Sequence, residues 1–153
     1  MTGLPRAVAA LLALAVALGP ARADAAVSCT VSTTPLAFGS YDPILANRAT
    51  PLDSLATVSY DCTGGTPALM MTLSAGAGSG FNPRLLFSGG NTLTYNLFLD
   101  AGRNTVWGDG TSGTSFFSGT KKKDDVRVFG RVFAGQDPAV GSYSNSIVIT
   151  INF

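Results

Sequence analysis

The sequence predicts an all-β domain, arranged as a β-sandwich or a β-barrel. Three observations predict this class. Apolar residues fall at every second position in several short segments, turn-forming residues separate those segments, and apolar residues at helical spacing do not recur along the chain. Many short strands at this spacing are typical of a sandwich or a barrel.

The first half of the chain predicts three strands. They are the segments 29–34 (CTVSTT), 55–62 (LATVSYDC) and 68–75 (ALMMTLSA). Between the first two lies FGSYDPILANRATPL at 38–52, which has no sustained period and contains two prolines. We expect this segment to be a long connection that pairs at most briefly at a sheet edge.

The second half predicts two further strands before the end of the chain, at 92–100 and 125–134. Their alternation is that of antiparallel strands with one face in a core. The residues expected to share a face are Leu93, Tyr95, Leu97 and Leu99 in the first strand, and Val126, Val128, Gly130 and Val132 in the second.

The closing segment, GSYSNSIVITINF, predicts a half-buried strand from Ser142 onward. One face carries Tyr143, Ile147, Ile149, Ile151 and Phe153, and no charged side chain follows Ile147. No residue follows Phe153 to form a hairpin and cover the far edge of the strand. Periodicity alone fits an ordinary core strand, but it also fits an edge that pairs with another chain.

The N-terminal residues predict a secretory signal peptide. Arg6 precedes a short apolar run, and the small residues Ala21, Ala23 and Ala25 follow it at the spacing that signal peptidase requires. The run is too short to cross a membrane as a helix. We therefore expect residues 1–25 to be removed and residues 26–153 to form one exported β-sandwich domain.

Charge and composition exclude several kinds of function. After removal of residues 1–25, lysines and arginines balance aspartates, and the chain contains no glutamate and no histidine. A neutral chain has no electrostatic reason to bind nucleic acid or an anionic membrane. Without histidine and without a recognisable catalytic constellation, we expect no enzyme, no catalytic residue, no cofactor and no small-molecule substrate.

The two cysteines, Cys29 and Cys62, are most simply a disulfide in an exported chain. On the chain-entropy model such a bridge would stabilise the fold by roughly 3 to 4 kcal/mol. A zinc site would need further thiol or imidazole ligands, which the sequence lacks, so we expect no metal site.

Four local motifs favour structural interpretations over ligand sites. Asp109 in WGDGTSGT fits a tight turn better than a calcium loop, because the further oxygen ligands at EF-hand spacing are absent. Trp107 is expected to pack an end of the sandwich, with ligand stacking as the alternative. KKKDD at 121–125 fits a solvated loop, and GAGSGF at 76–81 fits a hairpin connection without the P-loop lysine.

Several blocks in order carry a resemblance to a known family. They are CTVSTTPLAFGSYDP, VSYDC, YNLFLDAGRNTVWGDGT, VFGRVFAGQ and the terminal GSYSNSIVITINF. Together these blocks resemble the spore coat protein U family, which includes subunits of archaic chaperone–usher pili. The resemblance covers essentially the whole chain after residue 25.

The resemblance implies an immunoglobulin-like β-sandwich that lacks its last strand. A periplasmic chaperone would supply the strand first, and at the outer-membrane usher another pilin subunit would replace it. The residues that would form this strand-complementation and chaperone interface are Tyr143, Ile147, Ile149, Ile151 and Phe153. The chain would pass through the periplasm and end at the cell surface as a structural or adhesive component of a pilus.

One departure from the family bears on the role. If cleavage follows Ala25, only Ala26, Val27 and Ser28 precede Cys29, which is too short for a donor strand. This favours a tip or minor subunit that accepts a strand without donating one. The alternatives are a spore or cell coat protein outside any pilus and a complete secreted sandwich that binds a ligand through its loops.

Overall fold

The computed structural model describes residues 26–65 and 67–153, so the predicted signal peptide lies outside the described residues. The described part is all-β and contains eight strands. They are β1 (Ser28–Thr33), β2 (Leu52–Thr63), β3 (Leu69–Leu73), β4 (Arg84–Ser88), β5 (Asn91–Phe98), β6 (Phe117–Gly119), β7 (Lys123–Val132) and β8 (Ile149–Asn152). None of the described segments is a helix that is long and apolar enough to cross a membrane.

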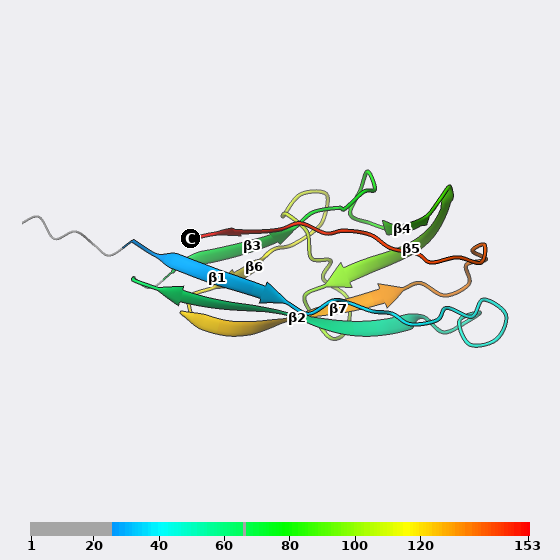
Figure 1. Cartoon of the computed structure of the whole chain (residues 1–153), viewed down its shortest axis with the longest axis horizontal. Coiled ribbons are helices and arrows are strands. Elements are labelled where there is room, and N and C mark those ends of the chain that lie inside the picture. Colours follow the sequence, from blue (N-terminus) through cyan, green and yellow to red (C-terminus); the bar gives the residue numbers. More distant parts are fainter. Residues whose placement is uncertain (1–25, 66) are drawn as a thin grey trace, which may run out of the picture.

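The strands form two antiparallel sheets that pack as the layers of an elongated sandwich (Figure 1). The larger sheet has the order β1-β2-β7-β5-β4, and the smaller has the order β6-β3-β8. β2 and β7 form the longest ladder, which runs from Leu52 opposite Val132 to Asp61 opposite Lys123. The predicted sandwich is therefore confirmed, and the barrel alternative is not.

The core lies between the two layers and is built from the alternating residues that the sequence singles out. Val126, Val128, Gly130 and Val132 of β7 are all buried, as predicted. Leu93, Tyr95 and Leu97 of β5 join them, while Leu99 is half-buried. Trp107 has no exposed surface, and its Nε1 donates a hydrogen bond to Met71 O at 3.0 Å, so the packing interpretation of this tryptophan is confirmed.

The prediction of a loop at KKKDD (121–125) is wrong for its last three residues, because β7 begins at Lys123 and pairs there with Asp61 of β2. The other predicted connections have the expected character. Residues 43–49 form turns, and β2 begins only at Leu52. In the loop after Trp107, Asp109 Oδ1 accepts hydrogen bonds from the backbone N–H and the hydroxyl of Thr111, at 2.9 and 2.6 Å. This aspartate is therefore engaged in turn chemistry of the kind that Asp-Gly sequences favour.

Two strands were not predicted, and the terminal strand is shorter than predicted. β4 and β6 are brief and have no repeated alternation. The terminal segment pairs at Ser144 with Phe87 of β4 and then, from Ile149, with β3. It passes from the edge of one sheet to the edge of the other, and because no single neighbour follows its whole length, the regular ladder is confined to Ile149–Asn152.

Candidate functional site along the terminal strand

An apolar groove opens between the terminal segment and the chain that follows β1. Its cavity volume is about 890 Å³. One wall is formed by residues 33–41 and the other by residues 138–145 with Ile147 and Ile149. In Figure 1 the terminal segment (red) and β1 with the residues after it (blue to cyan) both run along the length of the molecule. The floor is core surface from both sheets, including Val58, Leu73, Leu86, Leu93 and Val128.

The terminal wall presents alternate side chains to the core. From Ser142 to Ile151 the even-numbered residues are exposed and the odd-numbered residues are half-buried. Tyr143, Ile147, Ile149 and Ile151 pack against the hydrophobic core, whereas Val148 on the outer face is 64% exposed. The predicted phase of this segment is thus confirmed, and its inward side chains are covered on one side only.

The backbone of the terminal wall has one satisfied edge and one open edge. Ser144 exchanges hydrogen bonds with Phe87 of β4, and Val148 O accepts one from Ser74 N–H at 2.9 Å. By the alternation of an antiparallel ladder, Ile147, Ile149 and Ile151 direct their backbone groups to the opposite side. β8 pairs with β3 alone, and among the described residues the backbone N–H and C=O groups of Asn145 and Ile147 form no hydrogen bond to another backbone group.

The opposite wall is fixed to the larger sheet through β2. Thr34 N–H donates to Thr57 O at 3.0 Å, and Ala37 O accepts a hydrogen bond from Ser54 Oγ at 2.6 Å. Leu36 and Phe38 pack over Gly130, where an added Cβ would lie within 2.9 Å of both side chains. Gly130 therefore provides the room that lets this wall lie against β7.

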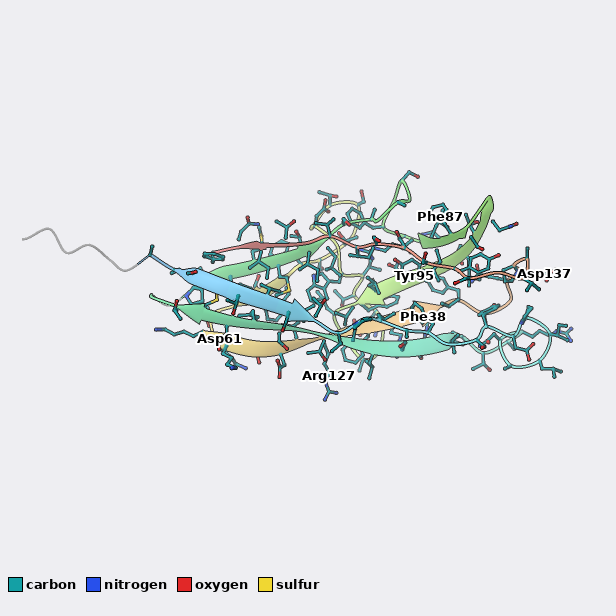
Figure 2. All side chains as sticks on the ribbon, in the orientation of Figure 1. Phe38, Asp61, Phe87, Tyr95, Arg127 and Asp137 are labelled. Atoms are coloured by element: carbon teal, nitrogen blue, oxygen red, sulfur yellow. A yellow bond between two sulfur atoms is a disulfide. The ribbon has the colours of Figure 1, made fainter. Side chains whose placement is uncertain are left out.

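Tyr95 in β5 connects the two walls across the floor. Its ring meets that of Phe38 edge to face, with centroids 5.9 Å apart, and its hydroxyl accepts a hydrogen bond from Asn145 Nδ2 at 3.0 Å. Figure 2 shows Tyr95 and Phe38 close together between the terminal segment and the segment after β1. Burial raises the pKa of Tyr95, so its hydroxyl stays protonated at neutral pH.

A buried arginine joins three chain segments next to the groove. Arg84 at the start of β4 has no exposed surface. It donates to Asn96 Oδ1 at 2.7 Å, to Trp107 O at 2.6 Å and twice to Ser74 O, at 3.1 and 3.0 Å. Burial lowers the pKa of Arg84 to about 10, which leaves the guanidinium charged at neutral pH. The arrangement ties the end of β3 to β5 and to the Trp107 loop.

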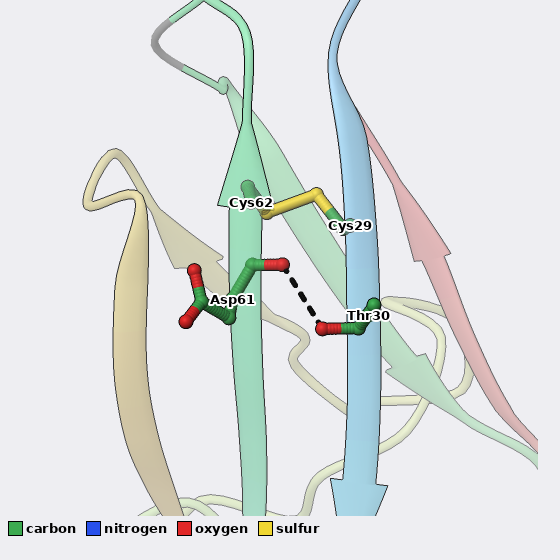
Figure 3. The surroundings of a disulfide bond; sticks show 4 residues. All are labelled: Cys29, Thr30, Asp61 and Cys62. Carbon is green, nitrogen blue, oxygen red and sulfur yellow. Dashed lines mark hydrogen bonds between the residues drawn. A yellow bond between two sulfur atoms is a disulfide. The ribbon is translucent and has the colours of Figure 1, made fainter.

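The disulfide joins the first two strands at one end of the larger sheet. Cys29 and Cys62 lie directly opposite each other in the β1–β2 pair, with Cα atoms 4.0 Å apart (Figure 3). The neighbouring Thr30 Oγ1 donates to Asp61 O at 3.3 Å. The pairing predicted from the sequence is confirmed, and it attaches the strand that leads into one wall of the groove.

Comparison of the sequence with known protein families identifies the family to which the chain belongs. The profile of the Spore Coat Protein U domain matches residues 15–150, which is most of the chain. The chain belongs to the Spore Coat Protein U domain family. The resemblance inferred from the sequence blocks is therefore confirmed.

Relatives of this Spore Coat Protein U domain include Protein U of Myxococcus xanthus, which is 32% identical over 185 residues with all of each chain covered. Among solved structures, the CsuC-CsuE chaperone-tip adhesion subunit complex of archaic chaperone-usher Csu pili from Acinetobacter baumannii matches with a TM-score of 0.57 at 20% identity. That match covers 84% of this chain and 40% of the other, so the likeness is one of fold.

A further match is to the minor tip subunit HdaB of the E. coli Hda pilus. Its TM-score is 0.43 at 16% identity, covering 80% of this chain and 79% of that one.

The structure brings together only part of the predicted interface of this Spore Coat Protein U domain. Tyr143, Ile147 and Ile149 line the groove. Ile151 packs against the core beyond the groove lining, and Phe153 is 54% exposed. The role of these five residues in strand complementation remains a prediction.

Sequence reasoning missed the opposite wall, the polar part of the floor and one polar residue of the terminal wall, Asn145. The missed residues are Leu36, Phe38, Tyr41, Tyr95 and Asn145. A weak signal was present, because Leu36 and Phe38 keep the spacing of alternate residues after Pro35. Tyr41 is placed by long-range bonds: its hydroxyl donates to Phe133 O and accepts from Gln136 N–H, both at 3.0 Å.

Proposed function

We propose that this chain is an exported structural subunit of a surface pilus, and that a strand from another polypeptide completes its fold. The observation that carries the proposal is the groove, in which an unpaired backbone edge runs beside an open apolar floor. An extended segment laid in the groove would extend the smaller sheet by backbone hydrogen bonds and would bury its alternate side chains. A flat apolar edge left open is otherwise an aggregation hazard.

The partners that fit this mechanism are a periplasmic pilus chaperone, an outer-membrane usher and other pilin subunits. Support for the chaperone comes from the similar tip adhesion subunit of Acinetobacter baumannii, which is named as a pre-assembly complex with one. The acceptor residues in the proposal are Tyr143, Ile147 and Ile149, with Ile151 and Phe153 further along the same edge. The role is structural rather than catalytic, and the chain passes through the periplasm to the cell surface.

The finer part of the proposal is a tip or minor position in the pilus. It rests on the predicted cleavage after Ala25, which leaves three residues before Cys29. Strands are most often about five or six residues long, so three residues are too few to span a groove of this kind. A chain cleaved there would accept a strand and donate none.

A spore or cell coat component is the second candidate, and the family description favours it. Strand addition between coat subunits would use the same groove. The two roles differ in the assembly that forms. A pilus subunit is recovered in fibres that depend on a chaperone and an usher, whereas a coat protein reaches the surface without them.

The test is export of the chain to an oxidising periplasm, alone and together with a chaperone or a donor-strand peptide. We expect aggregation or degradation of the chain alone and a soluble one-to-one complex with the partner, measured as native mass and thermal unfolding. Ile147→Asp places a charge in the groove and should abolish the rescue. Val148→Asp is the matched control, because this neighbouring side chain is exposed on the outer face.

The opposite result would replace the proposal. The sandwich is complete if the chain alone is a soluble monomer with a cooperative melt and if Ile147→Asp does not change its binding to the chaperone or the donor-strand peptide. A secreted sandwich that binds a ligand through its loops would then be the better account.

A further inference from the structure

The inward face of the terminal wall is interrupted by one amide side chain. Asn145 lies between Tyr143 and Ile147 in the half-buried phase and lines the groove. A polar group at this place is costly to bury unless it finds hydrogen-bond partners. The hydrogen-bond partners around Asn145 therefore indicate which kind of side chain can bind next to it in the groove.

The Asn145 amide is held in a fixed orientation. Its Oδ1 accepts a hydrogen bond from Ala77 N–H at 3.0 Å, and its Nδ2 donates to the Tyr95 hydroxyl at 3.0 Å. Gly76, at φ +78°, leaves the space that the amide occupies, because a Cβ there would clash with it. The side chain is thus positioned before any partner arrives.

This cluster keeps hydrogen-bonding capacity that the described residues do not use. The Asn145 amide group has two N–H donors, and one of them is bonded to Tyr95. The Tyr95 oxygen accepts that bond, and no described side-chain or backbone oxygen accepts its own proton. Tyr95 is only 3% exposed and lies in the groove floor, so a strand laid across it would cut off the remaining water.

We propose that Asn145 and Tyr95 form a polar subsite that selects a hydroxyl-bearing or amide-bearing side chain at one inward position of the incoming strand. The other inward positions meet Ile147, Ile149 and the apolar floor, and these select apolar side chains. The inference rests on the proposed function, since it takes a strand of another polypeptide as the occupant. A strand is the expected occupant because the backbone groups on the open edge of the terminal wall lack hydrogen-bond partners.

The physical basis is the asymmetry of buried hydrogen bonds. An apolar side chain over the subsite would leave two donors without acceptors, which weakens binding far more than one added hydrogen bond strengthens it. A threonine has the shape of valine and adds one oxygen that accepts from these donors. A comparison of threonine with valine therefore measures the effect of the hydroxyl at nearly constant side-chain volume.

The probe is a pair of synthetic peptides of about a dozen residues, the length of a long strand. Every inward residue is valine in one peptide, and the central inward residue is threonine in the other. Each peptide competes with a labelled all-valine peptide for the exported, disulfide-bonded chain. We expect the threonine peptide to bind about tenfold more tightly.

Three variants of the chain make the test specific. Asn145→Leu should reverse the preference, and Tyr95→Phe, which keeps the ring against Phe38, should reduce it. Tyr143→Phe is the matched control: it removes another groove-wall hydroxyl, which donates to Ala139 O at 2.8 Å, and it should keep the preference.

Each outcome decides between the two proposals. If both peptides bind the parent chain equally, or if Asn145→Leu and Tyr95→Phe leave the preference unchanged, the polar subsite is wrong while strand acceptance stands. A water retained over Tyr95 would produce that equality. If neither peptide binds, the proposed function fails and the subsite fails with it.

Discussion

Ser74 and Val148 exchange two hydrogen bonds at the point where the terminal segment joins the smaller sheet. Ser74 N–H donates to Val148 O, and Val148 N–H donates to Ser74 Oγ, both at 2.9 Å. The carbonyl of the same serine accepts two bonds from Arg84. One residue thus connects the buried arginine with the edge of the groove.

Ser74→Ala should loosen the terminal strand without disturbing the core. The substitution removes the hydroxyl oxygen that accepts from Val148 N–H and, at 3.2 Å, from Gly76 N–H. The shorter of these hydrogen bonds contributes about 1 kcal/mol. We expect amide hydrogen exchange at Val148 to accelerate about fivefold, with less change at the buried residues of β7. Equal acceleration in both places would show that Ser74 acts on global stability instead.

Arg84→Gln should destabilise the fold strongly, because Ser74 O and Trp107 O lose their donor and Asn96 Oδ1 keeps only Leu97 N–H. We expect a loss of about 2 to 4 kcal/mol in the free energy of unfolding, measured by denaturation of the chain bound to a donor peptide. Arg127→Gln is the control: Arg127 is exposed on the outer face of β7 and points away from the molecule in Figure 2. Its loss should stay within about 0.5 kcal/mol, and a similar cost for both variants would contradict the assigned role.

The part of the fold that the sequence predicts is the part with repeated alternation. The interior segments with several inward apolar residues in phase, such as β5 and β7, are strands, because one buried face specifies the register. The terminal segment has the same phase but is a regular strand only from Ile149 to Asn152. β4 failed this criterion. It is five residues long and begins with Arg84. A charged residue predicts an exposed position, and the acceptors that allow Arg84 to be buried come from three other segments of the chain.

Only one wall of the groove, the terminal one, was predicted from the sequence, and the reason is related. The phase of Tyr143, Ile147 and Ile149 is local information, whereas the partners of the terminal segment are not. The opposite wall depends on contacts between residues distant in sequence, such as Leu36 and Phe38 over Gly130. Those contacts are set by tertiary packing and leave only a weak alternation after Pro35.

Removal of the disulfide should weaken the wall that follows β1. The bridge closes a loop with a sequence separation of 33 residues, so the Cys29→Ser, Cys62→Ser double variant should lose about 3 to 4 kcal/mol on the chain-entropy model. Denaturation of the parent with and without a thiol reductant measures the same quantity. A loss below about 1 kcal/mol would contradict the chain-entropy account of this bridge.

Asp53 on the outer face of the larger sheet should make stability depend on pH in the acid range. Arg131 donates to Asp53 from Nε at 2.7 Å and from Nη2 at 2.8 Å, and Arg103 Nε lies 3.3 Å away. The hydrogen bonds from Arg131 lower the pKa of Asp53 below its ordinary value of 3.8, with the charge of Arg103 adding to the effect and burial opposing it.

The direction of the pH effect follows from this lowered pKa. The folded carboxylate binds a proton less readily than the unfolded one, so its contribution is complete above about pH 4 and is lost as the pH falls through the folded pKa. Because the pair is partly exposed, the contribution at neutral pH should be at most about 1 kcal/mol.

Asp53→Asn should flatten the acid limb of the stability curve, and in a double-mutant cycle Arg131→Gln should add little to it. An unchanged acid limb in Asp53→Asn would assign the acid sensitivity to other carboxylates, because only the Asp53 proton equilibrium is removed by that change.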